Sequence, residues 1–287
     1  MVTVEALEAL DLSLWLQTGE AAGGILHCDQ STISRRKSKV LSVFKASLAR
    51  HDRGWRIDSD FPRILEMERE VHQWNRLTKT SKLRLHIPYW SHHVIRPYLP
   101  EPVVCNPPES SALCDNVLEL LRSRVVDACI LTPTQLNGVD CEDLELVDLY
   151  ASPINLYCLP SFGGTSHRPL SPSTLRGNSR LQVASFLPLS CRKSCHLRYK
   201  ELTGFENEST FNNGSVHNVS FLTPLMSSHF PHAFKTAVSI DWAYRETLVF
   251  LKALSSNPRI QELSNLVQKS FLGLTVNKGA CLEITVV

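Results

Sequence analysis

The sequence predicts an α/β protein that begins with a winged helix-turn-helix, continues through a linker helix and ends in a larger α/β region. Three observations predict this order. A capped polar segment follows two short helical segments, a turn signal divides the extended residues after it, and strands alternate with helices beyond residue 80. After the first 80 of the 287 residues, roughly 205 remain, enough for one large or two small α/β units.

Apolar residues at helical spacing predict a first helix over about residues 3–17 with one apolar face. That face is formed by Val4, Leu7, Leu10 and Leu14. A second, short helix is expected over about residues 20–26. Its Gly23 and Gly24 either weaken it by up to about 1 kcal/mol each or mark the close packing of two helices.

The segment from Leu26 to Arg36 is the most informative one. Asp29 is a good N-cap, and short polar residues backed by arginines follow it. Such side chains suit a helix in the DNA major groove, where amides and hydroxyls reach base edges and guanidinium groups grip phosphate or guanine. The candidate DNA-binding residues in this helix are Gln30, Ser31, Thr32, Ser34, Arg35 and Arg36. Taken alone, the polar run is equally compatible with a capped, solvated surface helix.

The third helix is expected to turn Ile33, Val40, Leu41 and Phe44 inward. Asp-Arg-Gly at residues 52–54 then predicts the turn of a β-hairpin, a wing that adds Arg53 and Arg56 to the DNA-binding candidates. Between Ser31 and Arg56 there are eight Lys or Arg residues and one acid, whereas the whole chain carries only +2. This local basic charge is typical of a DNA-binding module fused to a region that does not touch DNA.

A linker helix is expected after the wing, where residues 63–79 contain neither glycine nor proline. Its apolar residues follow the 3-4-3 spacing of a coiled-coil seam: Ile64, Met67, Val71 and Trp74. Such a stripe is often a face packed on its own domain. Here a seam with a second subunit is favoured, because one helix-turn-helix covers few base pairs and two-fold pairing doubles the contacts.

Beyond residue 80, a strand at Leu83–Ile87, an amphipathic helix at Asn116–Arg124 and a buried strand at Val125–Leu131 predict a βαβ unit with a parallel sheet. Two further short strands are expected at Leu144–Leu149 and Pro153–Leu159.

From about Leu10 to Ile57 the chain resembles the N-terminal domain of LysR-type transcriptional regulators. The matching residues are Ala22, Leu26, His27, Gln30, Ser31, Ile33, Ser34 and Arg35, with Arg53, Gly54, Trp55, Arg56 and Ile57 in the wing. Five positions depart from the family pattern. Gly23 replaces an alanine, Lys37 a buried aliphatic residue, Lys45 a glycine at a turn, and Ala49 and His51 a common Phe and Arg. The similarity continues strongly over Val126–Ile130 and Leu146–Leu159. It also includes His167–Leu170 and a helix expected from Trp242 to Leu254, and is weak from about residue 171 to 240.

The resemblance implies a DNA-binding domain over residues 1–59, a linker and dimerisation helix over 60–80, and an effector-binding domain over 81–287. The last has the type-2 periplasmic-binding-protein fold, with residues 81–159 and 235–287 in a first α/β subdomain and 160–234 in a second. The implied protein is a homodimer or homotetramer. Its partners are double-stranded DNA and a small-molecule effector, with RNA polymerase as a further candidate, and no membrane.

Ligands of open α/β sheets bind beyond the carboxyl ends of the strands. The candidate effector-binding residues are therefore Tyr89, Trp90, Ser91 and His92 after one strand and Thr132 and Thr134 after another. An aromatic pair with hydroxyls suits a small organic acid or an aromatic compound. Alternatively, the aromatic pair merely covers a subdomain edge. No metal is expected at His92 and His93, since adjacent residues of a strand point apart and no carboxylate or thiol is close in sequence.

Nine scattered cysteines form no paired CxxC motif. Cys191 and Cys195 have cationic neighbours, which lower the pKa of a thiol, so a thiol-based redox-responsive regulator is one alternative. Another is a small-molecule-binding or protein-interaction protein with a degenerate DNA-binding domain. The sequence has no Gly-x-Ser-x-Gly, P-loop, Gly-x-Gly-x-x-Gly or His-Glu-x-x-His motif, so neither an enzyme nor a cofactor is expected. Without a signal peptide or a long apolar run, a cytoplasmic location is expected.

Overall fold

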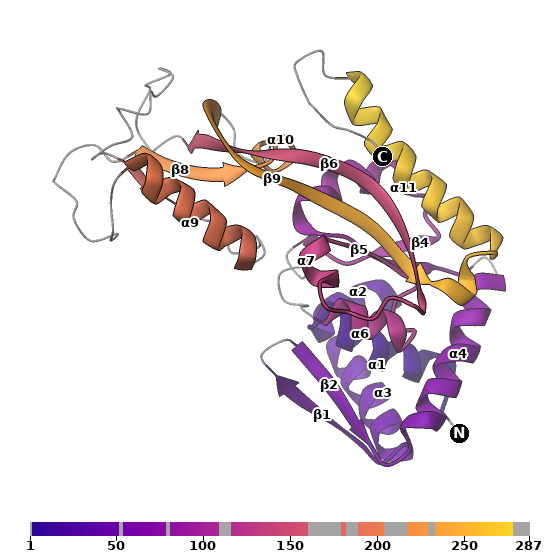
Figure 1. Ribbon diagram of the computed structural model, residues 1–287. Helices are drawn as coiled ribbons and strands as arrows, with labels where there is room; N and C mark the ends of the chain where they lie inside the picture. The colour runs from indigo at the N-terminus through magenta and orange to yellow at the C-terminus, as the bar shows by residue number, and fades with distance from the viewer. Residues whose placement is uncertain are drawn as a thin grey trace. The chain divides into compact units, whose positions relative to one another are not determined.

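The computed structural model describes residues 2–51, 54–78, 81–108, 116–159, 179–181, 189–203, 217–228 and 233–277 (Figure 1). The chain divides into two compact units, each considered by itself. The first comprises residues 1–131, 139–147 and 247–271, and the second comprises 132–138, 148–246 and 272–287. Among the described residues, no helix combines the length and apolar character needed to cross a membrane.

Three helices open the first unit, as predicted: α1 (Val4–Leu16), α2 (Gly19–Leu26) and α3 (Gln30–Val43). Each begins at a polar N-cap whose side chain accepts a backbone N–H of the first turn, and these caps are Thr3, Thr18 and Asp29. Ile33, Val40 and Phe44 are buried as expected, and Leu41 is half-buried. The three helices contact one another and form the helix-turn-helix.

Helix α1 differs from its prediction of one apolar face. Val4 is 47% exposed, whereas every residue from Ala9 to Leu16 is buried, including Asp11 at 1% exposure. The reason is that α1 packs on α2 and α3 and also bonds, through Asp11 and Trp15, to residues that follow the wing. A helix enclosed on all sides is central to its unit.

The departures from the family pattern at residues 23 and 45 have local explanations. A Cβ at Gly23 would lie 2.5 Å from the backbone oxygen of Cys28, so only glycine fits this tight turn between α2 and α3. Gly23 thus marks a close approach to the backbone of this turn, whereas a Cβ at Gly24 would meet nothing within 4 Å. Lys45 has φ 44° after α3, a left-handed conformation that favours glycine.

The wing consists of antiparallel strands β1 (Ala46–His51) and β2 (Gly54–Ser59), with Leu48 opposite Ile57. The turn residues 52 and 53 lie outside the described residues. Helix α4 (Pro62–Thr78) follows. Its buried face carries Leu65, Arg69, Gln73, Arg76 and Leu77, and its exposed face carries Ile64, Met67, Val71 and Trp74.

The rest of the first unit is an α/β layer with the strand order β4-β3-β5-β9. Strand β3 (Leu83–His86) pairs in parallel with β4 (Val103–Cys105) and with β5 (Ala128–Leu131), which confirms the predicted parallel βαβ unit. The helical elements are η1 (Tyr89–Ser91), α5 (His92–Ile95), η2 (Arg96–Tyr98), α6 (Val117–Arg122), η4 (Lys252–Leu254) and α11 (Pro258–Asn277).

Two long strands correct the prediction for the second half of the chain. Strand β6 (Leu144–Leu159) is continuous over 16 residues where two short strands were expected. Strand β9 (Phe234–Leu251) runs antiparallel to β5 and occupies most of the helix expected from Trp242 to Leu254, which was wrong. Its aromatic and β-branched residues favour a strand, and burial alternates from Ala243 to Glu246 as in one.

The second unit continues the strand order as β9-β6-β8-β7. It contains α7 (Pro133–Leu136), β7 (Ser179–Leu181), α9 (Leu189–Thr203), β8 (His217–Leu222) and α10 (Pro224–Ser227). The compact units divide within β6, at residues 147/148, and within β9, at 246/247. The subdomain bounds at 159/160 and 234/235 stay a prediction. The long strands are continuous, so the compact units cannot be separated at turns. The expected region His167–Leu170 lies outside the described residues.

Candidate nucleic-acid interface

The cap of α3 is built around the Asp29 carboxylate. Its Oδ1 accepts hydrogen bonds from Ser31 Oγ at 2.6 Å and from the backbone N–H of Thr32 at 2.7 Å, and its Oδ2 accepts from Thr32 Oγ1 at 3.2 Å. These bonds, that of Ser31 foremost, lower the pKa of Asp29 to about 2. Asp29 therefore stays charged, and the first turn of α3 is fixed at neutral pH.

Most of the predicted DNA-reading side chains are accessible on α3. Gln30, Ser31, Ser34 and Arg35 are exposed, and Thr32 is half-buried. The Arg35 guanidinium donates to Thr32 Oγ1 at 3.1 Å, which holds it beside the polar first turn. The structure thus brings amide, hydroxyl and guanidinium groups together at one helix end. Their contact with DNA stays a prediction.

The other predicted arginines are placed differently. Arg36 is half-buried, with Nη1 3.9 Å from Cys28 Sγ at the turn between α2 and α3. Arg56 of β2 forms an ion pair with Glu119 of α6 at 3.1 Å, and both side chains are about half exposed. The Asn116 side chain also donates to the Trp55 carbonyl at 3.3 Å. The wing is therefore in contact with α6. Arg53 lies outside the described residues.

A buried cluster of charges, which the sequence analysis missed, joins α1, α4 and β3. Arg69 Nε donates to Asp11 Oδ1 at 2.9 Å. The Arg84 guanidinium lies 3.8 Å from Asp11 and 3.6 Å from Glu8. Burial and the charge of Arg76 lower the pKa of Arg84 to about 10. Helix α1 of the helix-turn-helix is thereby tied to α4 and to the sheet of the same unit.

Asp127, before β5, is the second centre of this cluster and is fully buried. Its carboxylate accepts from Arg76 Nη2 at 2.8 Å, from Gln73 Nε2 at 3.2 Å and from the backbone N–H of Arg84 at 2.9 Å. Burial by itself would lower the pKa of Arg76, but the charge and hydrogen bonds of Asp127 raise it above its usual value. The sequence signal for this set was the polar stripe Arg69, Gln73 and Arg76 on α4.

His86 of β3 makes a further bond to α1. Trp15 Nε1 donates to His86 Nδ1 at 3.2 Å, and both side chains are buried. Burial lowers the pKa of His86 to about 3, with a smaller contribution from His92. The imidazole is therefore neutral at physiological pH and serves as an acceptor for the indole of α1.

The predicted effector-binding residues fall into two groups, one in each unit. In the first unit, Trp90 and Ser91 are buried, Tyr89 is 42% exposed, and His92 Nε2 lies 2.8 Å from the Asn106 carbonyl. In the second unit, Thr132 is buried and forms a capping box at the start of α7, which also contains Thr134. An effector role for these residues stays a prediction.

The sequence analysis also missed Asn106, which is fully buried beside the first group. Its Oδ1 accepts from the Ile87 N–H at 2.7 Å and its Nδ2 donates to the Ile87 carbonyl at 3.0 Å. Asn106 thus fixes the backbone between β3 and the aromatic pair. An asparagine between a strand and prolines gave no distinctive signal.

Three of the described cysteines lie in surroundings that disfavour a reactive thiol. Cys195 is buried in α9, and burial raises the pKa of Cys105 to about 12 and that of Cys158 as well. Cys191 also lies in α9, but its side chain is outside the described part of the structure. Across the described ranges, no three His, Cys, Asp or Glu side chains gather as metal ligands.

Comparisons with known proteins were made with the sequence and with the structure. No family model matches the sequence, and no curated protein matches it either. The structure is similar to CrgA, a LysR-type transcriptional regulator from Neisseria meningitidis, at 12% identity and a TM-score of 0.44, covering 94% of this chain and 99% of that one.

Two further solved structures show the same level of similarity. ArgP from Mycobacterium tuberculosis has 14% identity and a TM-score of 0.47, covering 95% of this chain and 98% of that one. Full-length CbnR complexed with its target DNA has 13% identity and a TM-score of 0.44, covering 92% and 98%. All three TM-scores lie below 0.5, so the proposals below depend on this chain's own residues.

Proposed function

We propose that this protein is a ligand-responsive, sequence-specific DNA-binding transcription regulator of the LysR type. The observation that carries the proposal is the first turn of α3. There a fixed N-cap presents Gln30, Ser31, Ser34 and Arg35 to solvent beside a two-stranded wing. Amide, hydroxyl and guanidinium groups at a helix N-terminus suit base edges and phosphates of a major groove.

The working form would be a homo-oligomer paired through α4. Ile64, Met67, Val71 and Trp74 are between 45% and 64% exposed along this helix. Four large apolar side chains at coiled-coil spacing favour a second copy of the same helix as their partner. Two-fold pairing would then place two recognition helices on two half-sites of one operator.

The buried cluster offers a route by which an effector would alter DNA binding. Arg69 and Arg76 of α4 bond to Asp11 of α1 and to Asp127 before β5, respectively. A change in this α/β layer that shifts Asp127 would therefore act on the linker helix. Such a mechanism requires an effector with different affinities for two arrangements of the protein.

Footprinting of the purified protein on DNA flanking its own gene, across a salt series, tests the proposal. A protected site spanning two half-sites, with protection that weakens as salt rises, is expected. Arg35→Ala should weaken binding to that site by about 1–3 kcal/mol if the arginine reads a base. Arg198→Ala is the matched control, since Arg198 is exposed on α9 and pairs with Glu201 of the same helix.

Two other outcomes would contradict parts of this proposal. Equal affinity of the wild type and Arg35→Ala would exclude a base-reading role for that residue. Protection no stronger than on unrelated DNA would favour a small-molecule-binding or protein-interaction protein with a degenerate DNA-binding domain.

A further inference from the structure

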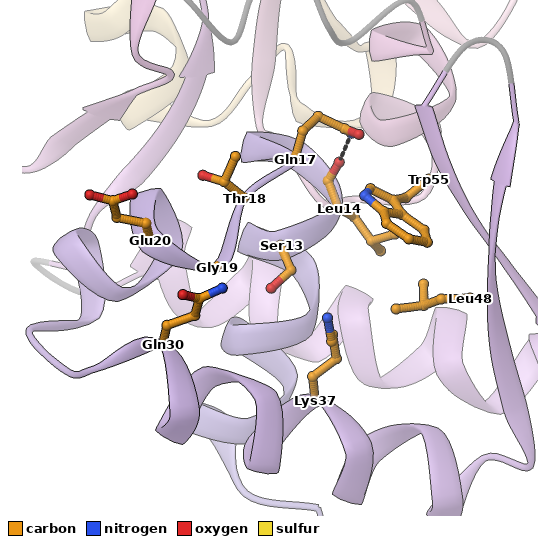
Figure 2. A pocket seen from close by; sticks show the side chains of 10 residues that line it. All are labelled: Ser13, Leu14, Gln17, Thr18, Gly19, Glu20, Gln30, Lys37, Leu48 and Trp55. Carbon is orange, nitrogen blue, oxygen red and sulfur yellow. Dashed lines mark hydrogen bonds between the residues drawn. The ribbon is translucent and has the colours of Figure 1, made fainter.

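A cavity of about 430 Å³ lies within the DNA-binding domain itself (Figure 2). Its walls come from the end of α1, the start of α2, Gln30 and Lys37 of α3 and both strands of the wing. This volume is in the range of small-molecule sites. All of its lining residues belong to the first unit, and none belongs to the predicted effector-binding set.

One part of the cavity is polar. Ser13, Gln30 and Lys37 line it, and Figure 2 shows the Lys37 side chain extending from α3 into the cavity. Among the described residues, no carboxylate lies within ion-pairing distance of the Lys37 ammonium. The Ser13 hydroxyl donates to the Ala9 carbonyl at 2.7 Å, so the Lys37 ammonium and the Gln30 amide are the groups that would bind a single anionic group there.

The opposite part is apolar. Leu14, Leu48 and Trp55 line it, and the Arg50 guanidinium lies 6.0 Å from the centre of the Trp55 ring. The backbone of Trp55 is also held by Asn116. An indole and two leucines favour a compact apolar body, whereas a bare anion would leave them against water.

Glu20 and Gly19, at the start of α2, also bear on which ligand would fit the cavity. Glu20 also lines the cavity, and Figure 2 shows its carboxylate directed away from Lys37. This second charge disfavours a ligand with two anionic groups. At Gly19 a Cβ would lie 3.0 Å from Gln30 Cγ, so a larger residue there would press on the side chain that the polar part uses.

We propose that this cavity binds a small monocarboxylate with a compact apolar body, such as an aromatic acid. The carboxylate would lie at Lys37 and Gln30, and the body against Leu48 and Trp55. A ligand there would contact the recognition helix and the wing together, so ligand and DNA would alter each other's affinity reciprocally. This site is independent of the effector site proposed for the C-terminal domain.

Nuclear magnetic resonance of the full-length protein without DNA tests the proposal, with benzoate as the probe. The readout is the indole N–H resonance of Trp55, assigned by its loss in Trp55→Phe. This readout separates the cavity from any benzoate site in the C-terminal domain. Benzoate should shift this resonance saturably, and uncharged benzyl alcohol should bind more weakly.

Two lysine variants locate the charge. Lys37→Met should weaken benzoate binding by about tenfold or more, since a hydrogen bond to a charged group is lost. Lys37→Arg, which keeps the cation, should retain much of the binding and shows that the position tolerates substitution. The exposed Lys39 provides the control Lys39→Met, with unchanged binding expected.

Three results would overturn the proposal. The first is the lack of any saturable shift of the Trp55 resonance with benzoate. The second is equal benzoate affinity in Lys37→Met and the wild type. The third is tighter binding of dimethyl phosphate than of benzoate, which would indicate that the cavity binds the DNA backbone.

Discussion

The two faces of helix α4 have opposite chemistry and opposite surroundings. The face packed inside the first unit carries Arg69, Gln73 and Arg76, which are at most 5% exposed. The other face carries Val71 and Trp74, which are 64% and 45% exposed. An isolated surface helix normally shows the reverse distribution, with apolar residues inside.

Each face of α4 suits a different partner. The buried polar face is matched by acids: Asp11 faces Arg69, and Asp127 faces Arg76 and Gln73. Burial of these charges is tolerated because each is paired and hydrogen-bonded. The apolar face has no such match within the described part of the chain, in agreement with the proposed pairing of two copies.

The largest expected effect comes from the apolar face. The double variant Val71→Glu/Trp74→Glu should convert the oligomer to a folded monomer. Burial of each such side chain contributes about 1.5–3 kcal/mol, the loss occurs on both helices of the pair, and glutamates would also repel each other. Light scattering checks the mass. Leu197→Glu is the control, since Leu197 is 64% exposed on α9. An intact oligomer in the double variant would refute the seam.

The interactions of the buried polar face are disrupted most directly by a substitution of Asp127. Asp127→Asn keeps the size but removes the charge that compensates the buried Arg76, so the free energy of unfolding should fall by about 3–5 kcal/mol. Urea denaturation measures it. Asp143→Asn removes an exposed partner of Arg122 instead, and should cost at most about 1 kcal/mol. Equal losses in the two variants would contradict the contrast between buried and exposed pairs.

His86, which bonds to α1, should make the stability of the protein depend on pH. Its pKa is about 3 in the folded protein and about 6.5 in the unfolded chain, so the unfolded chain takes up the extra proton between these values. The free energy of unfolding should therefore decrease as the pH is lowered through this window, by about 2 kcal/mol from pH 7 to 5. His86→Gln keeps an acceptor for Trp15 and should lose this part of the pH dependence.

The control for the pH experiment is His196→Gln, since His196 is exposed on α9. This variant should retain the wild-type slope of stability against pH. An unchanged slope in His86→Gln would mean that His86 is not kept neutral by burial.

The smallest effect is expected at the exposed pair between Arg56 and Glu119. Glu119→Gln releases the wing arginine, which should tighten DNA binding by up to about fivefold, since exposed ion pairs contribute about 0–1 kcal/mol. Glu70→Gln breaks the exposed pair with Arg124 and should leave DNA affinity unchanged. Anisotropy titration at fixed salt measures both. Weaker binding of Glu119→Gln than of the wild type would contradict a competition for Arg56.

Local signals predicted the N-terminal region well. The Asp29 cap, the inward Ile33 and Val40, and the paired strands of the wing depend on nearby residues, and the structure agrees with each. The helix expected from Trp242 depended on the resemblance alone, and its aromatic and β-branched residues form a strand instead. Pairing of β9 with β5 over residues 247–250 decides between them, and this contact is remote in sequence.

The sequence by itself determined the order of the elements through α4, the capped polar helix and its local basic charge, because these depend on spacing and on neighbouring residues. Only the tertiary structure decided that α1 is enclosed on all sides, that Asp127 compensates Arg76 across 51 positions of the chain, and that Lys37 lines a cavity. The physical reason is that buried charges and cavities are defined by which distant groups face each other. Periodicity within one element does not encode that information.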